Sequence, residues 1–179
     1  MYFFSNVWQV STQPTAFFAI NNGHETIPKL LWYLYRVISI AVLLGLLTSL
    51  YLKPQSTSQI TQLTENYGAT FPLYVGLITL LAPIGLILFQ MLNALIMYAL
   101  IRLIGGHGTY RDSLLATVYG TSPNLVAGLP MIGIFTNLLA LYVTWVGLAK
   151  LHHISLWKSS IITLVSYFIT LSFLANLLI

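Results

Sequence analysis

One uninterrupted apolar stretch decides the fold class of this chain. From Phe71 to Ile104 it reads FPLYVGLITLLAPIGLILFQMLNALIMYALIRLI, with no acidic residue. As a helix rising 1.5 Å per residue it would be about 51 Å long, whereas the hydrocarbon core of a bilayer is about 30 Å thick. Pro83 divides the stretch unequally, and only the part after it is long enough to cross. The stretch therefore predicts one long, kinked helix that spans the membrane over about 79–104 and whose first turns project from the membrane or lie along its surface.

The composition excludes a soluble protein. The 179 residues include 7 Lys and Arg and 3 Asp and Glu, and 58% of the chain is hydrophobic. A soluble domain of this length would carry about 45 charged residues, so this chain has too few to build a water-facing surface. The same scarcity excludes a disordered chain and a nucleic-acid-binding face. An integral membrane protein remains.

Four further segments have the length and composition of membrane spans. The first ends where Lys53-Pro54 stops the helix, and Gly128-Leu129-Pro130 divides a later apolar run into a tight hairpin. The predicted fold is thus an all-α, polytopic membrane protein with five transmembrane helices, at about 30–52, 79–104, 113–129, 132–149 and 157–178.

The N-terminal residues 1–28 are amphipathic. Polar residues interrupt their apolar stretches, which are therefore too short to cross a membrane. Thr12-Gln13-Pro14 resembles a helix start. These residues predict an interfacial helical segment ahead of a five-span domain at 29–179, and a disordered tail is the alternative.

Charge placement predicts the orientation. With five spans and a cytoplasmic N-terminus, six of the seven basic residues fall on the cytoplasmic side: Lys29, Arg36, Arg102, Arg111, Lys150 and Lys158. This distribution is what the positive-inside rule expects, and the opposite orientation would leave only Lys53 inside.

All four histidines belong to the segments predicted to be cytoplasmic. With Glu25 and Asp112 nearby, a divalent metal site involving His24, His107 and His152 is one hypothesis. Hydrogen bonding of the histidines to headgroups or loop backbone is the other. Apart from this metal, the sequence predicts no cofactor.

A second set of polar residues is predicted to lie near the middle of the bilayer. This polar belt comprises Gln90, Asn93, Tyr119, Pro123, Asn124 and Asn137. Polar groups in hydrocarbon need partners, so the belt either joins helices through hydrogen bonds or forms a substrate site at a broken helix.

Enzyme signatures are lacking from the sequence. The residues around His24 read GHETIP without the second histidine of a zinc protease helix, and no nucleophile elbow or phosphate-binding loop is present. We therefore expect a protein that is not an enzyme.

Three stretches resemble the Yip (Ypt-interacting protein) domain family. They are the glycine-rich loop and helix GGHGTYRDSLLATVYGTSPNLVAG from Gly105 to Gly128, the element Leu151-His152-His153-Ile154-Ser155, and the opening Gln13-Pro14-Thr15-Ala16-Phe17-Phe18. The resemblance implies five spans and a cytoplasmic N-terminus. Eukaryotic members are implicated in early secretory traffic and contact small Rab-type GTPases. The short N-terminal region is more similar to bacterial members, which implies a bacterial or cyanobacterial inner membrane. For such members the resemblance does not imply Rab binding.

Two functions follow as hypotheses. The first is a membrane-organising or scaffold-like protein that contacts lipid, or another membrane or cytoplasmic protein, through its cytoplasmic face. The predicted contact residues are Gly106, His107, Tyr110, Arg111, His152, His153 and Lys158. The second is a small-molecule or ion transporter or channel that uses the polar belt.

Overall fold

A computed structural model describes residues 2–20, 25–52, 71–129 and 132–177, and within these ranges every regular element is a helix. The all-α prediction is confirmed for this part of the chain. The helices are α1 (Tyr2–Thr12), α2 (Pro14–Ile20), α3 (Ile27–Leu52), α5 (Phe71–Leu103), α6 (Tyr110–Gly120), the 3₁₀ helix η2 (Ser122–Val126), α7 (Ile132–Leu151) and α8 (Leu156–Leu177).

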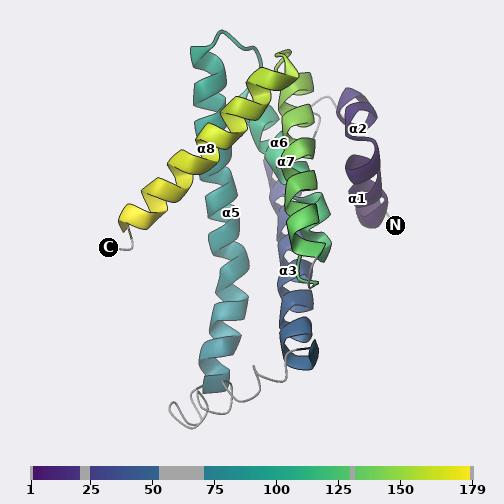
Figure 1. The fold of residues 1–179 in the computed structure, drawn as a ribbon, viewed down its shortest axis with the longest axis vertical. Coiled ribbons are helices and arrows are strands. Elements are labelled where there is room, and N and C mark those ends of the chain that lie inside the picture. The colour runs from purple at the N-terminus through teal and green to yellow at the C-terminus, as the bar shows by residue number, and fades with distance from the viewer. Residues whose placement is uncertain (1, 21–24, 53–70, 130–131, 178–179) are drawn as a thin grey trace.

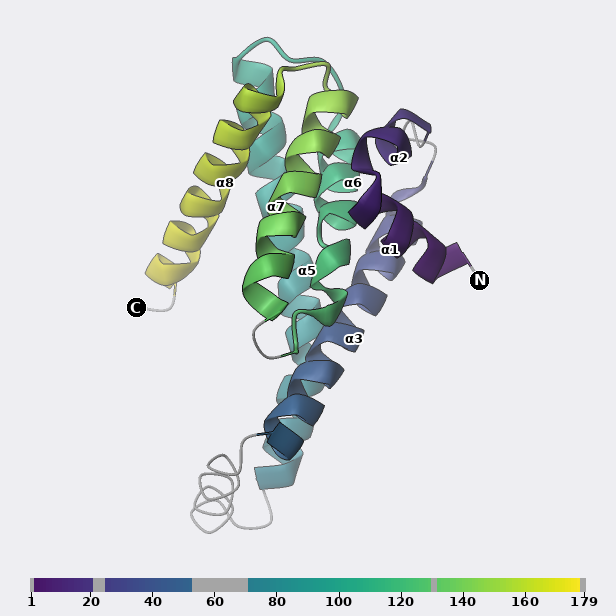
Figure 2. The ribbon, with the colours of Figure 1, turned by 45° about the vertical axis from the view of Figure 1, so that its right-hand side comes forward.

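In the described part of the chain, four helices are long and apolar enough to cross a membrane, at Ile27–Thr48, Leu80–Leu103, Ile132–Leu151 and Leu156–Phe173. They make the chain a polytopic membrane protein. The second of them lies within α5, a single helix of 33 residues that continues through Pro83. Figures 1 and 2 show α3 and α5 extending beyond the end of α7 at the side of the molecule opposite the α5–α6 loop.

The predicted third span, 113–129, is wrong as a continuous helix. The α-helix stops after 11 residues at Gly120, and a 3₁₀ helix follows. The physical reason is Pro123, which has no N–H to donate and whose ring crowds the carbonyl four residues earlier. Thr121 closes the turn, because its backbone N–H donates to the Thr117 carbonyl and its hydroxyl to the Val118 carbonyl, at 3.1 and 2.7 Å.

The N-terminal segment forms two helices packed on the bundle. The helix start predicted near Pro14 is confirmed, since α2 begins at that residue. Val10, Phe17 and Phe18 are buried, and α2 packs against α7. In both views α1 and α2 lie along one side of α6 and α7, while α8 lies on the other (Figures 1 and 2). Residues 2–20 are therefore not a disordered tail.

Small residues let two pairs of elements approach closely. A Cβ added at Gly128 would lie 2.4 Å from the Gly45 backbone nitrogen and 2.6 Å from the Ala41 carbonyl oxygen. A Cβ added at Gly120 would lie 2.0 Å from the Thr144 hydroxyl. These contacts hold η2 and the turn after it against α3, and α6 against α7.

Candidate functional site

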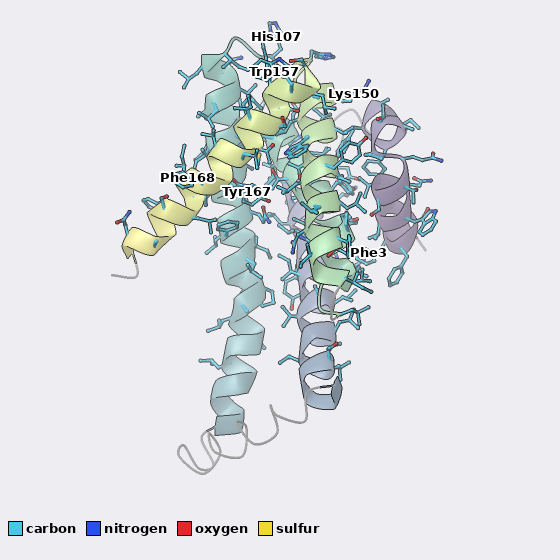
Figure 3. The ribbon with its side chains drawn as sticks, in the orientation of Figure 1. Phe3, His107, Lys150, Trp157, Tyr167 and Phe168 are labelled. Atoms are coloured by element: carbon cyan, nitrogen blue, oxygen red, sulfur yellow. The ribbon has the colours of Figure 1, made fainter. Side chains whose placement is uncertain are left out.

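Two loops, distant in the sequence, meet at one end of the bundle. One follows α5 and the other joins α7 to α8, and we call residues 104–109 and 152–155 together the loop platform. The His107 backbone N–H donates to the His152 carbonyl at 3.4 Å, and a His152 ring nitrogen lies 2.5 Å from the His107 carbonyl oxygen. His107 and Trp157 lie at the same end of the molecule in Figure 3. Two of the predicted contact segments thus form one surface.

The platform rests on helices that end in the same way. After α5, the Gly106 N–H donates to the Ile101 carbonyl at 2.9 Å, and Gly105 has φ of 77°. After α7, the Ile154 N–H donates to the Ala149 carbonyl at 3.1 Å, and His153 has φ of 54°. Both are Schellman-type ends, in which a left-handed residue turns the chain out of the helix. His153 occupies a position that usually favours glycine, and its side chain is exposed.

His152 is the buried anchor beneath the platform. Its side chain is fully buried, with Nδ1 against the His107 carbonyl and Nε2 at 2.9 Å from the Ser113 hydroxyl. Burial lowers the pKa of His152 below its usual value, and the His107 carbonyl and the Asp112 carboxylate oppose that shift. A neutral ring suits these partners, because Nδ1–H then donates to the carbonyl while Nε2 accepts from the hydroxyl. The imidazole ties the start of α6 to the loop that follows α7.

Asp112 is engaged locally. Its carboxylate accepts hydrogen bonds from the Thr109 backbone N–H at 2.7 Å and the Thr109 hydroxyl at 2.8 Å. The bond from the Thr109 N–H belongs to a capping box at the start of α6, and it supplies a partner for a backbone donor that the helix leaves free. The carboxylate therefore fixes the junction between the platform and α6.

The predicted contact residues divide into exposed and structural members. His107, His153 and Lys158 are exposed, and Arg111 is half-buried. Gly106 and His152 are buried, so their role in any contact would be to position others. The remaining member, Tyr110, is half-buried and its hydroxyl donates to the Met91 carbonyl at 3.3 Å.

Additional exposed residues at this end were not among the predicted contact residues. Arg102 and Leu103 are exposed beside the platform and Ile104 within it, and Leu103 is 81% exposed. Trp157, at the start of α8, is 63% exposed. Their signal in the sequence is the mixture of basic and large apolar residues at helix ends, which is typical of a membrane interface.

The polar belt is divided among several environments. Asn93 is fully buried and its Oδ1 accepts from the Thr170 hydroxyl at 3.4 Å. Asn137 is exposed on α7, and Pro123 is buried in η2. The other two amides, Gln90 and Asn124, line a cavity of about 340 Å³ between α3, α5 and η2.

Asn124 lines two cavities. It also lines a second one, of about 280 Å³, together with Asn137 and Tyr167. The side-chain oxygens of Gln90 and Asn124 are buried without a hydrogen-bond partner. The belt residues are therefore not bonded to one another in a closed network, and the break in the third predicted span faces cavities on two sides.

Tyr119 belongs to a different polar cluster. Its hydroxyl donates to the Glu25 carboxylate at 2.7 Å, and the neighbouring Tyr33 hydroxyl lies 2.7 Å from that of Ser122. The two tyrosine rings are 4.7 Å apart between centroids. Sequence reasoning missed this cluster because 94 positions separate Tyr119 from Glu25.

The metal hypothesis has no further support in the described residues. Among them, no group of three or more His, Cys, Asp or Glu side chains is placed to hold a metal ion. Both ring nitrogens of His152 already have hydrogen-bond partners. His24 lies outside the described residues, so the set of His24, His107 and His152 stays a prediction.

Comparison with known proteins gives one match. The model of the Yip1 domain family matches residues 8–178. No curated protein and no solved structure matches the chain.

Proposed function

This chain belongs to the Yip1 domain family, and from that premise we propose that it is a non-enzymatic membrane protein that acts through protein or lipid contacts at its cytoplasmic face. The family match supports the role of an integral membrane protein. The proposed role is to organise a membrane or to hold a partner at its surface.

We propose five spans with the N-terminus in the cytoplasm. Four helices have the length to cross, and the path of α6 and η2 beside α7 supports a fifth crossing made of an α-helix and a 3₁₀ helix. Six of seven basic residues then face the cytoplasm, as the positive-inside rule expects. The proposed location is a bacterial or cyanobacterial inner membrane.

The topology can be tested because the chain contains no cysteine. A single cysteine at His153 should react with an impermeant maleimide only from the cytoplasmic side, and one at Gln55 only from the opposite side. Labelling of both from the same side would refute an odd number of spans between them.

The loop platform carries the proposal for function. A hydrogen-bonded pair of loops, anchored by a buried histidine, holds exposed basic and apolar side chains in a fixed arrangement. A preordered surface loses little conformational entropy on binding, so such a platform suits recognition. The exposed His107 and Lys158 and the half-buried Arg111 are the proposed contacts, while Gly106 and His152 position them.

Site-specific crosslinking in native membranes tests this role. A photoreactive residue at His107 should give discrete protein or lipid adducts that weaken when Arg111→Ala is added. The matched control is the same probe at Ser172, an exposed residue near the far end of α8. Identical adducts from both positions, or no effect of Arg111→Ala, would overturn the proposal.

The transporter alternative rests on the two cavities that share Asn124. It predicts water at the break in the third span. In the cysteine-free chain, Asn124→Cys should react with a small water-soluble thiosulfonate, whereas a cysteine at the buried Ala94 should not. An unreactive Asn124→Cys would exclude a hydrated path.

A further inference from the structure

Two cations lie on one face of a helix that is apolar enough to span the membrane. Lys29 and Arg36 are both within the window Ile27–Thr48 of α3, and Trp32 lies between them on the same face. Arg36 is nine residues, or about 13 Å, from the start of the helix. A charge at this distance along an apolar helix lies close to the hydrocarbon, which solvates it poorly, so an anionic partner at the level of the headgroups would stabilise it.

Aromatic rings flank Arg36, and no described residue forms an ion pair with its guanidinium. The guanidinium carbon lies 5.0 Å from the centroid of the Trp32 ring and 5.9 Å from that of Phe3. Of the two carboxylates that the structure describes, Asp112 accepts hydrogen bonds from Thr109 in the loop platform. Glu25 accepts from Tyr119, keeps its negative charge and lines the same cavity as Arg36. The rings contact the guanidinium through cation–π interactions, which leave its N–H groups able to donate to an acceptor.

These cations line a small cavity between α1 and α3. The cavity measures about 170 Å³, and Asn6, Glu25 and Tyr119 contribute to its wall together with Lys29 and Arg36. Asn6 adds an amide that can donate a hydrogen bond. With two cations against one carboxylate, the wall is net positive.

Helix α1 places this cavity at the level of the lipid headgroups. Its exposed side combines large aromatic residues with polar ones: Phe4 is 65% and Trp8 is 70% exposed, and Ser5 and Gln9 are exposed between and beside them. This mixture is typical of a helix at the membrane interface. Phe3 of the same helix contacts Arg36, so the cation and the interface lie together.

We propose that the cavity between α1 and α3 binds the phosphodiester of an anionic phospholipid, with Lys29 and Arg36 as its two cationic ligands. The arginine plane matches a pair of phosphate oxygens, and lysine adds a point charge. Glu25, fixed on Tyr119, borders the site. This lipid site is separate from the loop platform and does not depend on the function proposed for it.

Native mass spectrometry of the purified full chain tests the site. The protein in detergent is titrated with phosphatidylglycerol or with phosphatidylcholine of the same acyl chains. We expect the first lipid molecule to bind as phosphatidylglycerol in preference to phosphatidylcholine. Arg36→Gln and Lys29→Gln should each weaken the binding of phosphatidylglycerol about fivefold.

Matched variants separate a built site from general charge. Lys150→Gln removes the same charge from an exposed position that belongs neither to the cavity nor to the loop contacts proposed above, and it should leave the first binding event unchanged. Arg36→Lys keeps the charge but not the planar fork, so it should bind with intermediate strength and remain folded. Inorganic phosphate should fail to displace the lipid, because it lacks the acyl chains.

Three results would overturn the proposal. They are equal binding of the two lipids, equal weakening by Arg36→Gln and Lys150→Gln, and displacement of the lipid by inorganic phosphate. The last would assign the cavity to a soluble anion. If Arg36→Gln fails to fold, Lys29→Gln and Arg36→Lys decide the question.

Discussion

Two glycines of the loop between α5 and α6 allow a matched test of the His152 anchor. Both have left-handed backbones, with φ of 77° at Gly105 and 108° at Gly108. A Cβ at Gly105 would have no neighbour within 4 Å, whereas one at Gly108 would lie 2.5 Å from Nδ1 and 2.9 Å from Cε1 of His152. Gly105→Ala therefore tests backbone strain alone, and Gly108→Ala tests strain and displacement of the imidazole.

The expected difference follows from these contacts. Alanine in a left-handed conformation costs about 1–2 kcal/mol, and the cost is at least as large at Gly108 as at Gly105 because the φ of Gly108 lies farther from the left-handed minimum of about +57°. Moving His152 breaks its hydrogen bonds to the His107 carbonyl and the Ser113 hydroxyl, which leaves buried polar groups unpaired at about 1–3 kcal/mol each. We expect Gly108→Ala to be less stable than Gly105→Ala by at least about 2 kcal/mol, or about 4–8 °C in Tm for a chain of this length.

Thermal unfolding in detergent, followed by tryptophan fluorescence, measures the difference. A double-mutant cycle makes it specific, because His152→Ala should cost less in the Gly108→Ala background than in the original chain. Equal Tm values for Gly105→Ala and Gly108→Ala would refute the anchoring role that we assign to His152.

Two further predictions concern packing and pH. Gly128→Ala should lower the free energy of unfolding by about 1–3 kcal/mol, because its Cβ would clash with backbone atoms of α3, which cannot move aside as a side chain can. The control Gly85→Ala, whose Cβ would have no atom within 4 Å, should not destabilise the protein. Equal losses of Tm in the two variants would contradict the close contact at Gly128. Because burial holds the folded-state pKa of His152 below its unfolded value of about 6.5, its stabilising contribution is fully present above that pH and is lost as the pH falls through the folded-state pKa. Tm should therefore fall more steeply between pH 7 and pH 5 in the original chain than in His152→Gln, with Asp112 and His153 unchanged in both; parallel curves would show that His152 does not titrate in this range.

The sequence predicted the length of a helix where a long apolar run alone determines it, and the start of a helix where a proline marks it. The apolar run from Phe71 predicted α5 as one long helix, and Pro14 marked the start of α2. Pro123 carried the signal for the break after Gly120, but the surrounding residues were apolar enough to suggest a continuous span. The local sequence did not show at which residue before Pro123 the α-helix would end.

The candidate site could be predicted only in part, because it depends on contacts between residues that are distant in the sequence. The sequence placed His107 and His152 on one side of the membrane, but it could not show that one is exposed and the other buried. Likewise, Tyr119 was assigned to the polar belt by its depth, whereas its partner Glu25 precedes the first membrane-spanning helix. An amphipathic pattern such as that of residues 2–20 is the same whether a helix lies on lipid or on α7.

The position of α2 on α7 has a consequence for how the protein is made. Phe18 packs where a side chain on Gly147 would otherwise lie, and the two residues are 129 positions apart. At a synthesis rate of about 5–20 residues per second, Phe18 leaves the ribosome about 6–26 s before Gly147 exists. Throughout this interval α2 lacks the helix α7 that it packs against, so its apolar side must rest on lipid, on helices made earlier or on the insertion machinery. Helix α2 is thus made well before the surface that it finally occupies.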